Sequence, residues 1–222
     1  MAPVMNITEN VKQLLSELGP EIQLVAAAKS RTPAEVYECI EAGVKIIGQN
    51  YLKDAQRAIP IIGNKASWHF IGRLQRNKIP QTVALFDVIE TLDNLEIATL
   101  IDKECLSAGK VMPVLIEVNS GEEIQKAGVM PDKVADFVKQ ASTLKNIRIS
   151  GLMTMGPLVT EPEKCRPYFK ITRQVFEHVK AIGLTGIQML YLSMGMTDSY
   201  KVAIEEGANV VRIGSKIFGP RF

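Results

Sequence analysis

The stretch IQLVAAAKSRTPAEVYECIEAGVKII, residues 22–47, has the pattern of one strand, one helix and a second strand. The apolar runs Ile22–Ala28 and Val44–Ile47 each predict a short buried strand. Between them, Thr32 followed by Pro33 is typical of the start of a helix, and Gly43 is typical of its end. The segment therefore predicts a βαβ unit with two parallel strands.

The same alternation continues along the rest of the chain. With the first two strands, the short runs rich in Val and Ile give eight predicted strands: Ile22–Ala28, Val44–Ile47, Ser67–Ile71, Leu85–Glu90, Pro113–Asn119, Arg148–Met153, Gln188–Ser193 and Val210–Ile213. Eight units leave about 28 residues for each, close to the roughly 30 residues of a βαβ unit. We therefore expect one (β/α)8 TIM barrel over residues 1–222. An open doubly wound sheet is the alternative, and it is disfavoured because no G-x-G-x-x-G motif follows the first strand.

Three longer helices are expected from the periodicity of apolar residues: an extra N-terminal helix at Met5–Leu18, and helices at Leu92–Ala108 and Lys164–Ile182.

Composition excludes several classes of protein. Hydrophobic residues make up 46% and charged residues 23% of the chain, which excludes a mainly disordered protein. A net charge of +2 gives no broad positive surface for nucleic acid. No signal peptide or membrane span is recognisable, and the three cysteines form no C-x-x-C motif, so we expect a cytoplasmic protein. The two histidines, His69 and His178, belong to different elements, and we expect no metal site.

Lys29 is the first candidate functional residue, because functional groups of such barrels lie at the carboxyl ends of the strands. It follows the small, apolar residues Ala26, Ala27 and Ala28. Burial there disfavours the charged form of the amine, and a neutral amine is a nucleophile that forms Schiff bases with carbonyl compounds. The alternative is a lysine that extends from the barrel rim into solvent.

The ends of the last two strands predict an anion site. Ser193 supplies a hydroxyl group, Gly214 permits close approach of a ligand to the backbone, and Ser215 begins a short segment whose N–H groups can face an anion. Arg212 adds a permanent cation at the same end of the barrel. A lysine opposite an anion site suits pyridoxal 5′-phosphate (PLP), but a Schiff-base aldolase acting on a sugar phosphate would use the same groups.

Several longer motifs favour PLP binding over a Schiff-base aldolase. They are KSR at 29–31, GQN at 48–50, WHFIGRLQRNK at 68–78, GLM at 151–153, LSMGM at 192–196 and VRIGSKIFG at 211–219. Together they strongly resemble the pyridoxal phosphate homeostasis protein family, from about residue 5 to the end of the chain.

The resemblance implies a PLP-binding barrel of fold type III, like the N-terminal domain of alanine racemase, with the cofactor held as an internal aldimine on Lys29. Its predicted cofactor-binding residues are Lys29, Asn50, His69, Ser193, Met194, Arg212, Gly214 and Ser215. Ser193, Gly214 and Ser215 are expected to hold the phosphate, Arg212 to face the pyridine nitrogen, and Asn50 and His69 to line the ring pocket. Two departures from the family pattern are Gln49, where Glu is usual, and Ser199, where Asp is usual.

The resemblance also implies a role in intracellular vitamin B6 homeostasis without established turnover. We expect PLP and PLP-dependent apoenzymes as partners, no nucleic acid or membrane partner, and a monomer or weak dimer. An arginine beside the pyridine nitrogen weakens the ring as an electron sink, which argues against catalysis. A PLP-dependent amino-acid racemase or related enzyme remains the alternative, although no second catalytic base is recognisable.

Overall fold

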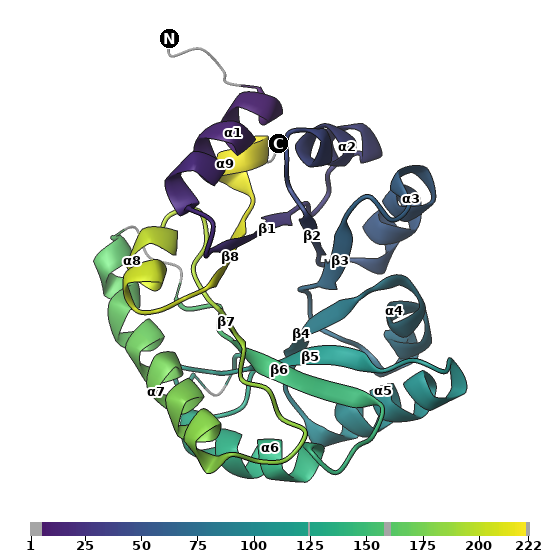
Figure 1. The fold of residues 1–222 in the computed structure, drawn as a ribbon, viewed down its shortest axis with the longest axis vertical. Helices are drawn as coiled ribbons and strands as arrows, with labels where there is room; N and C mark the ends of the chain where they lie inside the picture. Colours follow the sequence, from purple (N-terminus) through teal and green to yellow (C-terminus); the bar gives the residue numbers. More distant parts are fainter. Residues whose placement is uncertain (1–5, 124, 158–160, 221–222) are drawn as a thin grey trace.

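The protein folds as a closed eight-stranded parallel barrel, shown by a computed structural model that describes residues 6–123, 125–157 and 161–220. Each strand pairs with the next one in the chain, and β8 pairs with β1 to close the sheet (Figure 1). The strands are β1 Gln23–Ala27, β2 Ile46–Gln49, β3 Ser67–Phe70, β4 Val88–Leu92, β5 Met112–Glu117, β6 Ile147–Met153, β7 Tyr191–Ser193 and β8 Val210–Ile213. The predicted barrel is confirmed, and the open doubly wound sheet is wrong.

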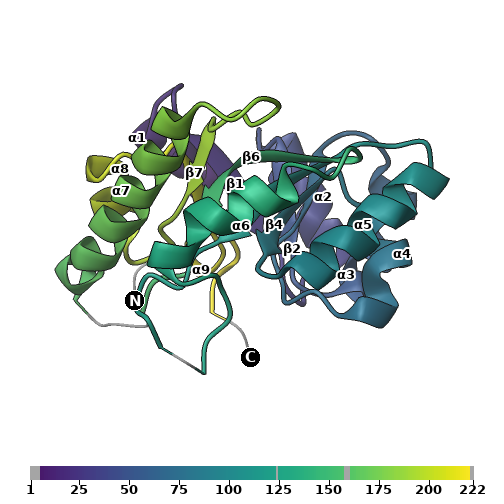
Figure 2. The ribbon, with the colours of Figure 1, turned by 90° about the horizontal axis from the view of Figure 1, so that it is seen from below.

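Helices surround the barrel on its outside, as the two views in Figures 1 and 2 show. The α-helices are α1 Ile7–Leu18, α2 Pro33–Glu41, α3 Leu52–Ile62, α4 Ile79–Leu85, α5 Leu95–Ser107, α6 Val134–Ala141, α7 Arg166–Ile182, α8 Tyr200–Glu205 and α9 Ser215–Phe218. The described residues also contain three 3-10 turns: η1 Arg76–Lys78, η2 Pro131–Lys133 and η3 Pro162–Cys165. None of the helices in the described part of the chain is long and apolar enough to cross a membrane.

The prediction misplaced the fourth strand and the helix after it. Leu85 was expected to begin that strand, but it ends α4, where the N–H of the C-cap Phe86 donates to the carbonyl of Thr82 (3.0 Å). The strand therefore runs to Leu92, and α5 begins only after the N-cap Asn94. As a consequence, Glu90 lies within β4 and not at its end.

The two other long helices agree more closely with the sequence. Helix α1 has Asn6 as its N-cap, and the predicted start at Met5 lies outside the described residues. The expected helix at Lys164–Ile182 is observed as the last residues of η3 followed by α7.

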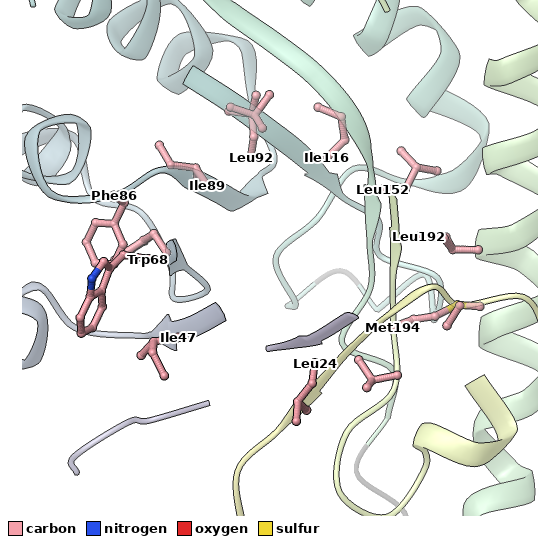
Figure 3. Close-up of a cluster of buried hydrophobic side chains, with 14 of the residues drawn as sticks. Leu24, Ile47, Trp68, Phe86, Ile89, Leu92, Ile116, Leu152, Leu192 and Met194 are labelled. Carbon is pink, nitrogen blue, oxygen red and sulfur yellow. The ribbon is translucent and has the colours of Figure 1, made fainter. Parts of the chain in front are cut away.

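Alternate strand residues face the helices and the barrel interior, because side chains in a strand have a period of two. Figure 3 shows ten labelled members of the outer apolar core, which packs between strands and helices: Leu24, Ile47, Trp68, Phe86, Ile89, Leu92, Ile116, Leu152, Leu192 and Met194. A separate small cluster of Val25, Ile71 and Val210 occupies the inner face. Ser193 and Arg212 continue that inner face toward the carboxyl ends of β7 and β8.

The N-terminal helix is fastened to the end of the chain. The Glu17 carboxylate of α1 accepts hydrogen bonds from the Tyr200 hydroxyl of α8 (2.5 Å) and the Lys216 ammonium of α9 (2.8 Å). Figure 1 shows α1 beside α9, although they lie at opposite ends of the sequence. The amide of Asn10 also donates to the carbonyl of Ile217 (2.9 Å). Helix α1 therefore fixes the position of α9 on the barrel.

This contact predicts a specific dependence of stability on pH. The hydrogen bonds from Lys216 and Tyr200 lower the pKa of Glu17 to about 2. Because the folded pKa is below the unfolded value, the contribution of Glu17 is complete above about pH 4.5 and is lost as the pH falls toward 2. Glu17→Gln is expected to lower the free energy of unfolding at pH 7 by about 1 kcal/mol or less, because the pair is partly exposed. Urea unfolding from pH 2 to 7 should show the two proteins converging at low pH. A difference that stays constant with pH would contradict this account.

Candidate functional site

Lys29 lies in a tight turn, two residues after Ala27, the last residue of β1. The N–H of Arg31 donates to the carbonyl of Ala28 (3.1 Å), which closes the turn around Lys29. Ser30 has a φ of 62°, and its N–H donates to the carboxylate of Asp54 on α3 (2.9 Å). A left-handed conformation at a residue other than glycine is costly and needs support from its surroundings. The turn is therefore held in one shape by α3.

The side chain of Lys29 lies beyond the carboxyl end of β1. Alternation from Val25 and Ala27 places Lys29 on the inner face, and its side chain is half-buried. Its Nζ lies 5.1 Å from the centre of the Tyr51 ring. Within the described residues, no carboxylate lies at ion-pair distance from this amine, in contrast to the paired Lys65 and Lys216. Lys29 is therefore available to a ligand.

A chain of buried polar groups crosses the barrel interior from β3 to β8. His69 Nδ1 lies 2.6 Å from Glu90 Oε1, and the Ser193 hydroxyl donates to Glu90 Oε2 (2.7 Å). Arg212 Nη1 donates to Ser193 Oγ (2.7 Å), and Arg212 Nη2 donates to the carbonyl of Thr154 (2.8 Å). Buried polar groups connected in this way fix one another's positions.

The charges of this chain balance one another inside the barrel. Burial alone would raise the pKa of Glu90, but the hydrogen bond from His69 and the charges of His69 and Arg212 lower it below its ordinary value. Burial lowers the pKa of Arg212, and the carboxylates of Glu90 and Glu117 oppose that effect. Glu90 is thus the acidic partner that permits a cation on β8 to be buried.

The predicted anion site lies where β8 continues into α9. A side chain at Gly214 would place its Cβ 3.1 Å from the carbonyl oxygen of Ala27, so the backbones of β1 and β8 approach closely there. Ser215 is exposed, and its hydroxyl donates to Thr197 Oγ1 (3.0 Å). The proton of Ser193 is already donated to Glu90, so its hydroxyl can serve an anion only by giving up that bond.

Asn50 and Met194 differ in which of their atoms can contact a ligand in the barrel. Asn50 is half-buried at the end of β2, and its amide donates to the carbonyl of Ile71 (3.3 Å). The side chain of Met194 is fully buried on the outer face, with Leu192 in the apolar core (Figure 3). Only the backbone of Met194 can therefore reach a ligand in the barrel.

The structure thus brings most of the predicted site residues to one end of the barrel, and it adds residues that the sequence analysis missed. Glu90 and Thr154 belong to the buried chain, and Glu117 lies buried at the end of β5. Glu90 could have been recognised as a buried functional residue, because it is the charged residue inside the apolar run VIETL at 88–92. The three cysteines are free and buried.

A cavity of about 190 Å³ opens next to the buried chain, at the ends of β5 and β6. Its lining consists of Glu117, Val118, Asn119, Ser120, Gly121, Glu123, Lys126, Ala127, Thr154, Met155, Gly156, Pro157 and Tyr168. None of the eight predicted cofactor residues lines it. The Lys29 site and this cavity are therefore two separate regions at one end of the barrel.

Gln49, the first departure from the family pattern, lies on the opposite side of β2 from Gly48. It shares the outer face with Ile47, and both polar atoms of its amide are buried with no hydrogen-bond partner among the described residues. A buried unpaired polar group costs about 1–3 kcal/mol. The departure therefore bears on stability, because the side chain points away from the barrel interior.

Replacing this amide with an apolar side chain of similar length should stabilise the fold. We expect Gln49→Met to raise the free energy of unfolding by about 1–2 kcal/mol, because the variant removes two unpaired atoms. Thermal unfolding would show a rise of about 2–4 °C per kcal/mol for a chain of this size. The exposed Gln56 on α3 supplies a matched control, since Gln56→Met should change stability by less than about 0.5 kcal/mol. A loss of stability in Gln49→Met would show that the amide has a function in the fold.

Comparison with known proteins places this geometry in a family. The sequence matches the model of the alanine racemase N-terminal domain over residues 4–221. A protein of Aquifex aeolicus (strain VF5) named pyridoxal phosphate homeostasis protein is 36% identical over 200 residues, which cover 90% of this chain and 87% of the relative.

Solved structures agree with the sequence comparison. PipY of Synechococcus elongatus PCC7942 has a TM-score of 0.90 in its structure without PLP and 0.88 in its structure with PLP bound, at 28% and 27% identity. Both alignments cover 96% of this chain and 100% of PipY. Alanine racemase of Clostridium difficile 630 has a TM-score of 0.78 at 16% identity over 97% of this chain and 56% of the racemase, which shows a shared fold.

The family model matches nearly the whole chain, and the curated relative exceeds 30% identity over most of it. The protein therefore belongs to the family of the alanine racemase N-terminal domain and, within it, to the pyridoxal phosphate homeostasis proteins.

Proposed function

We propose that this protein binds PLP through the Lys29 amine and acts in PLP homeostasis without catalytic turnover. The observation that carries the proposal is an amine with no acidic partner among the described residues, at the end of β1, the strand that pairs with β8 and its buried Arg212. A relative named for this role and a structure of PipY with PLP bound support it.

The residues present fit such a cofactor. Lys29 would supply the nucleophilic amine, and the backbone at Gly214 and the N–H groups at the start of α9 would receive the phosphate. Arg212 supplies a fixed cation for the ring nitrogen, while Asn50 and His69 would line the ring. PLP, when bound, supplies an aldehyde that condenses with amines and a ring that accepts electrons.

The environment of Arg212 argues for holding the cofactor rather than transforming it. Its guanidinium is fixed by Ser193 and the carbonyl of Thr154, and Glu90 balances its charge. A fixed cation beside the ring nitrogen disfavours protonation of that nitrogen, and an unprotonated ring stabilises a carbanion poorly. This chain therefore has the groups that bind PLP but keeps it weakly reactive.

One observation favours the alternative, a PLP-dependent amino-acid racemase or a related enzyme. Tyr51 lies against the Lys29 amine and is half exposed, so its hydroxyl is a candidate acid or base next to the site. Incubation with amino acids in D2O separates the two functions. Exchange of the α-hydrogen that is lost in Tyr51→Phe would establish an enzyme, whereas no exchange would support a binding protein.

Attachment of the cofactor can be tested on the wild-type protein. PLP is added, the visible spectrum is recorded, and borohydride is used to fix any attached cofactor before peptide mass mapping. We expect a yellow protein and a pyridoxyl group on Lys29. A colourless protein, or a label spread over exposed lysines, would overturn the proposal and favour a Schiff-base aldolase.

A further inference from the structure

The carboxyl group of Glu117 has no hydrogen-bond or ion-pair partner among the described residues, and Arg212 and Arg73 act on it only through charge at longer range. Glu117 ends β5 and is only 8% exposed. Most buried carboxyl groups are paired, because an isolated buried charge is costly. Glu117 instead lines the cavity of about 190 Å³ between the ends of β5 and β6.

Several other polar side chains of this cavity are already paired with neighbouring groups. The hydroxyls of Ser120 and Thr154 form a hydrogen bond (2.9 Å), and the amide of Asn119 bonds to the backbone of Glu123 in both directions. The ammonium of Lys126 is paired with the Glu123 carboxylate (2.5 Å). Glu117 is therefore the charged group of the cavity that still needs a donor.

We propose that this cavity binds a small aliphatic primary amine in its protonated form, with the ammonium group on the Glu117 carboxylate. An ammonium ion supplies both the charge and the hydrogen-bond donors that Glu117 lacks. Val118, Met155 and Pro157 supply apolar surface for an alkyl group. The volume is below the roughly 300 Å³ of the smallest sites for drug-sized ligands, which fits a ligand of a few heavy atoms.

The cavity adjoins the proposed cofactor site through Arg212, whose guanidinium donates to the carbonyl of Thr154 in the cavity lining. No predicted cofactor residue lines the cavity, so amine binding does not require PLP or Lys29. The paired state of Lys126 also means that a carboxylate on the ligand is not required. Free amines and amino acids share the ammonium group, and binding of 3-methylbutylamine and L-leucine distinguishes them.

Affinity should depend on pH in one direction. Burial raises the pKa of Glu117 to about 7, as does the charge of Asp93, while Arg212 and Arg73 oppose the rise. The remaining charged groups of the cavity, Lys126 and Glu123, are paired with each other. An ammonium ion binds the ionised carboxylate, so it displaces a proton from those molecules in which Glu117 is protonated. Affinity therefore rises between pH 6 and pH 8.

Isothermal titration calorimetry on the full-length protein, freed of carbonyl cofactors with hydroxylamine and then dialysed, tests the proposal. The probes are 3-methylbutylamine, L-leucine and 4-methylpentanoate, which has no amine. We expect 3-methylbutylamine to bind with proton release that decreases from pH 6 to pH 8, measured in two buffers of different ionisation enthalpy. Binding of L-leucine as well would extend the site to amino acids, whereas 4-methylpentanoate should not bind.

Glu117→Gln should weaken binding of the amine at least tenfold and abolish proton release. Glu21→Gln, at an exposed position before β1, is the matched control and should bind like the wild type. Equal binding of the acid without an amine would overturn the proposal on the wild-type protein alone, whatever the variants do. Unchanged affinity in a folded Glu117→Gln protein would also overturn it. Retained PLP attachment in either case would leave the function of Lys29 intact.

Discussion

Lys29→Ala is expected to abolish covalent attachment of PLP completely. The variant removes the only amine that the geometry places on the inner face at the end of β1, between the tight turn and the Tyr51 ring. After borohydride treatment, the wild-type protein should carry one pyridoxyl group per chain and the variant none. The phosphate site and the Arg212 cation remain, so weak and colourless binding of PLP can persist.

Controls for this result follow from the position of Lys29. Lys45 is exposed before β2, at the opposite end of the barrel, and Lys45→Ala should load PLP like the wild type. The free energy of unfolding should change by no more than about 1 kcal/mol in Lys29→Ala, because the lysine is half-buried and contacts the Tyr51 ring by a cation–π interaction. A pyridoxyl group trapped at full stoichiometry in folded Lys29→Ala would show that another lysine is the attachment point.

Glu90→Gln is expected to have the largest effect on stability. It leaves His69 and the buried Arg212 without their acidic partner, and the loss of one member of a buried ion pair costs about 3–5 kcal/mol. Urea unfolding at pH 7 measures the loss. Because the pKa of Glu90 is lowered in the folded protein, this contribution is present above the unfolded pKa and disappears as the pH falls through the folded pKa.

The matched control is Glu96→Gln, since Glu96 forms an exposed pair with Arg76 (2.7 Å). Exposed pairs contribute about 0–1 kcal/mol, so this variant should unfold almost like the wild type. A similar small change in Glu90→Gln would mean that the barrel interior screens Arg212 by other means. The double variant Glu90→Leu/Arg212→Leu should recover part of the stability, because it removes both buried charges together.

The fold was predictable because a barrel repeats one local pattern. Each βαβ unit carries its own signals, such as the cap at Thr32, whose side chain accepts the N–H of Glu35 (3.3 Å) as the sequence indicated. The closure of β8 on β1 was inferred from the number of βαβ units alone, because the sequence shows no sign of a contact between these two strands. The strand ends were located well enough to bring Lys29 and Arg212 to the same end of the barrel.

The site was predictable only in part, because the face of a strand changes with every residue. Met194 follows Ser193 by one position and therefore points into the outer core. The fourth strand was placed three residues too early, so Glu90 was expected at an end and its bonds to His69 and Ser193 were missed. Pairing between distant strands depends on register and barrel geometry, which a single sequence does not display.

The fastening of α1 to α9 has a consequence for biosynthesis. β1 pairs with β8, and α1 fixes α9, so the region that would receive the phosphate forms only when segments from the start and the end of the chain meet. A chain still growing on the ribosome has made Lys29 early but lacks Arg212, Gly214 and α9. We therefore expect cofactor loading to follow release of the finished chain, since contacts this distant in sequence form late in folding.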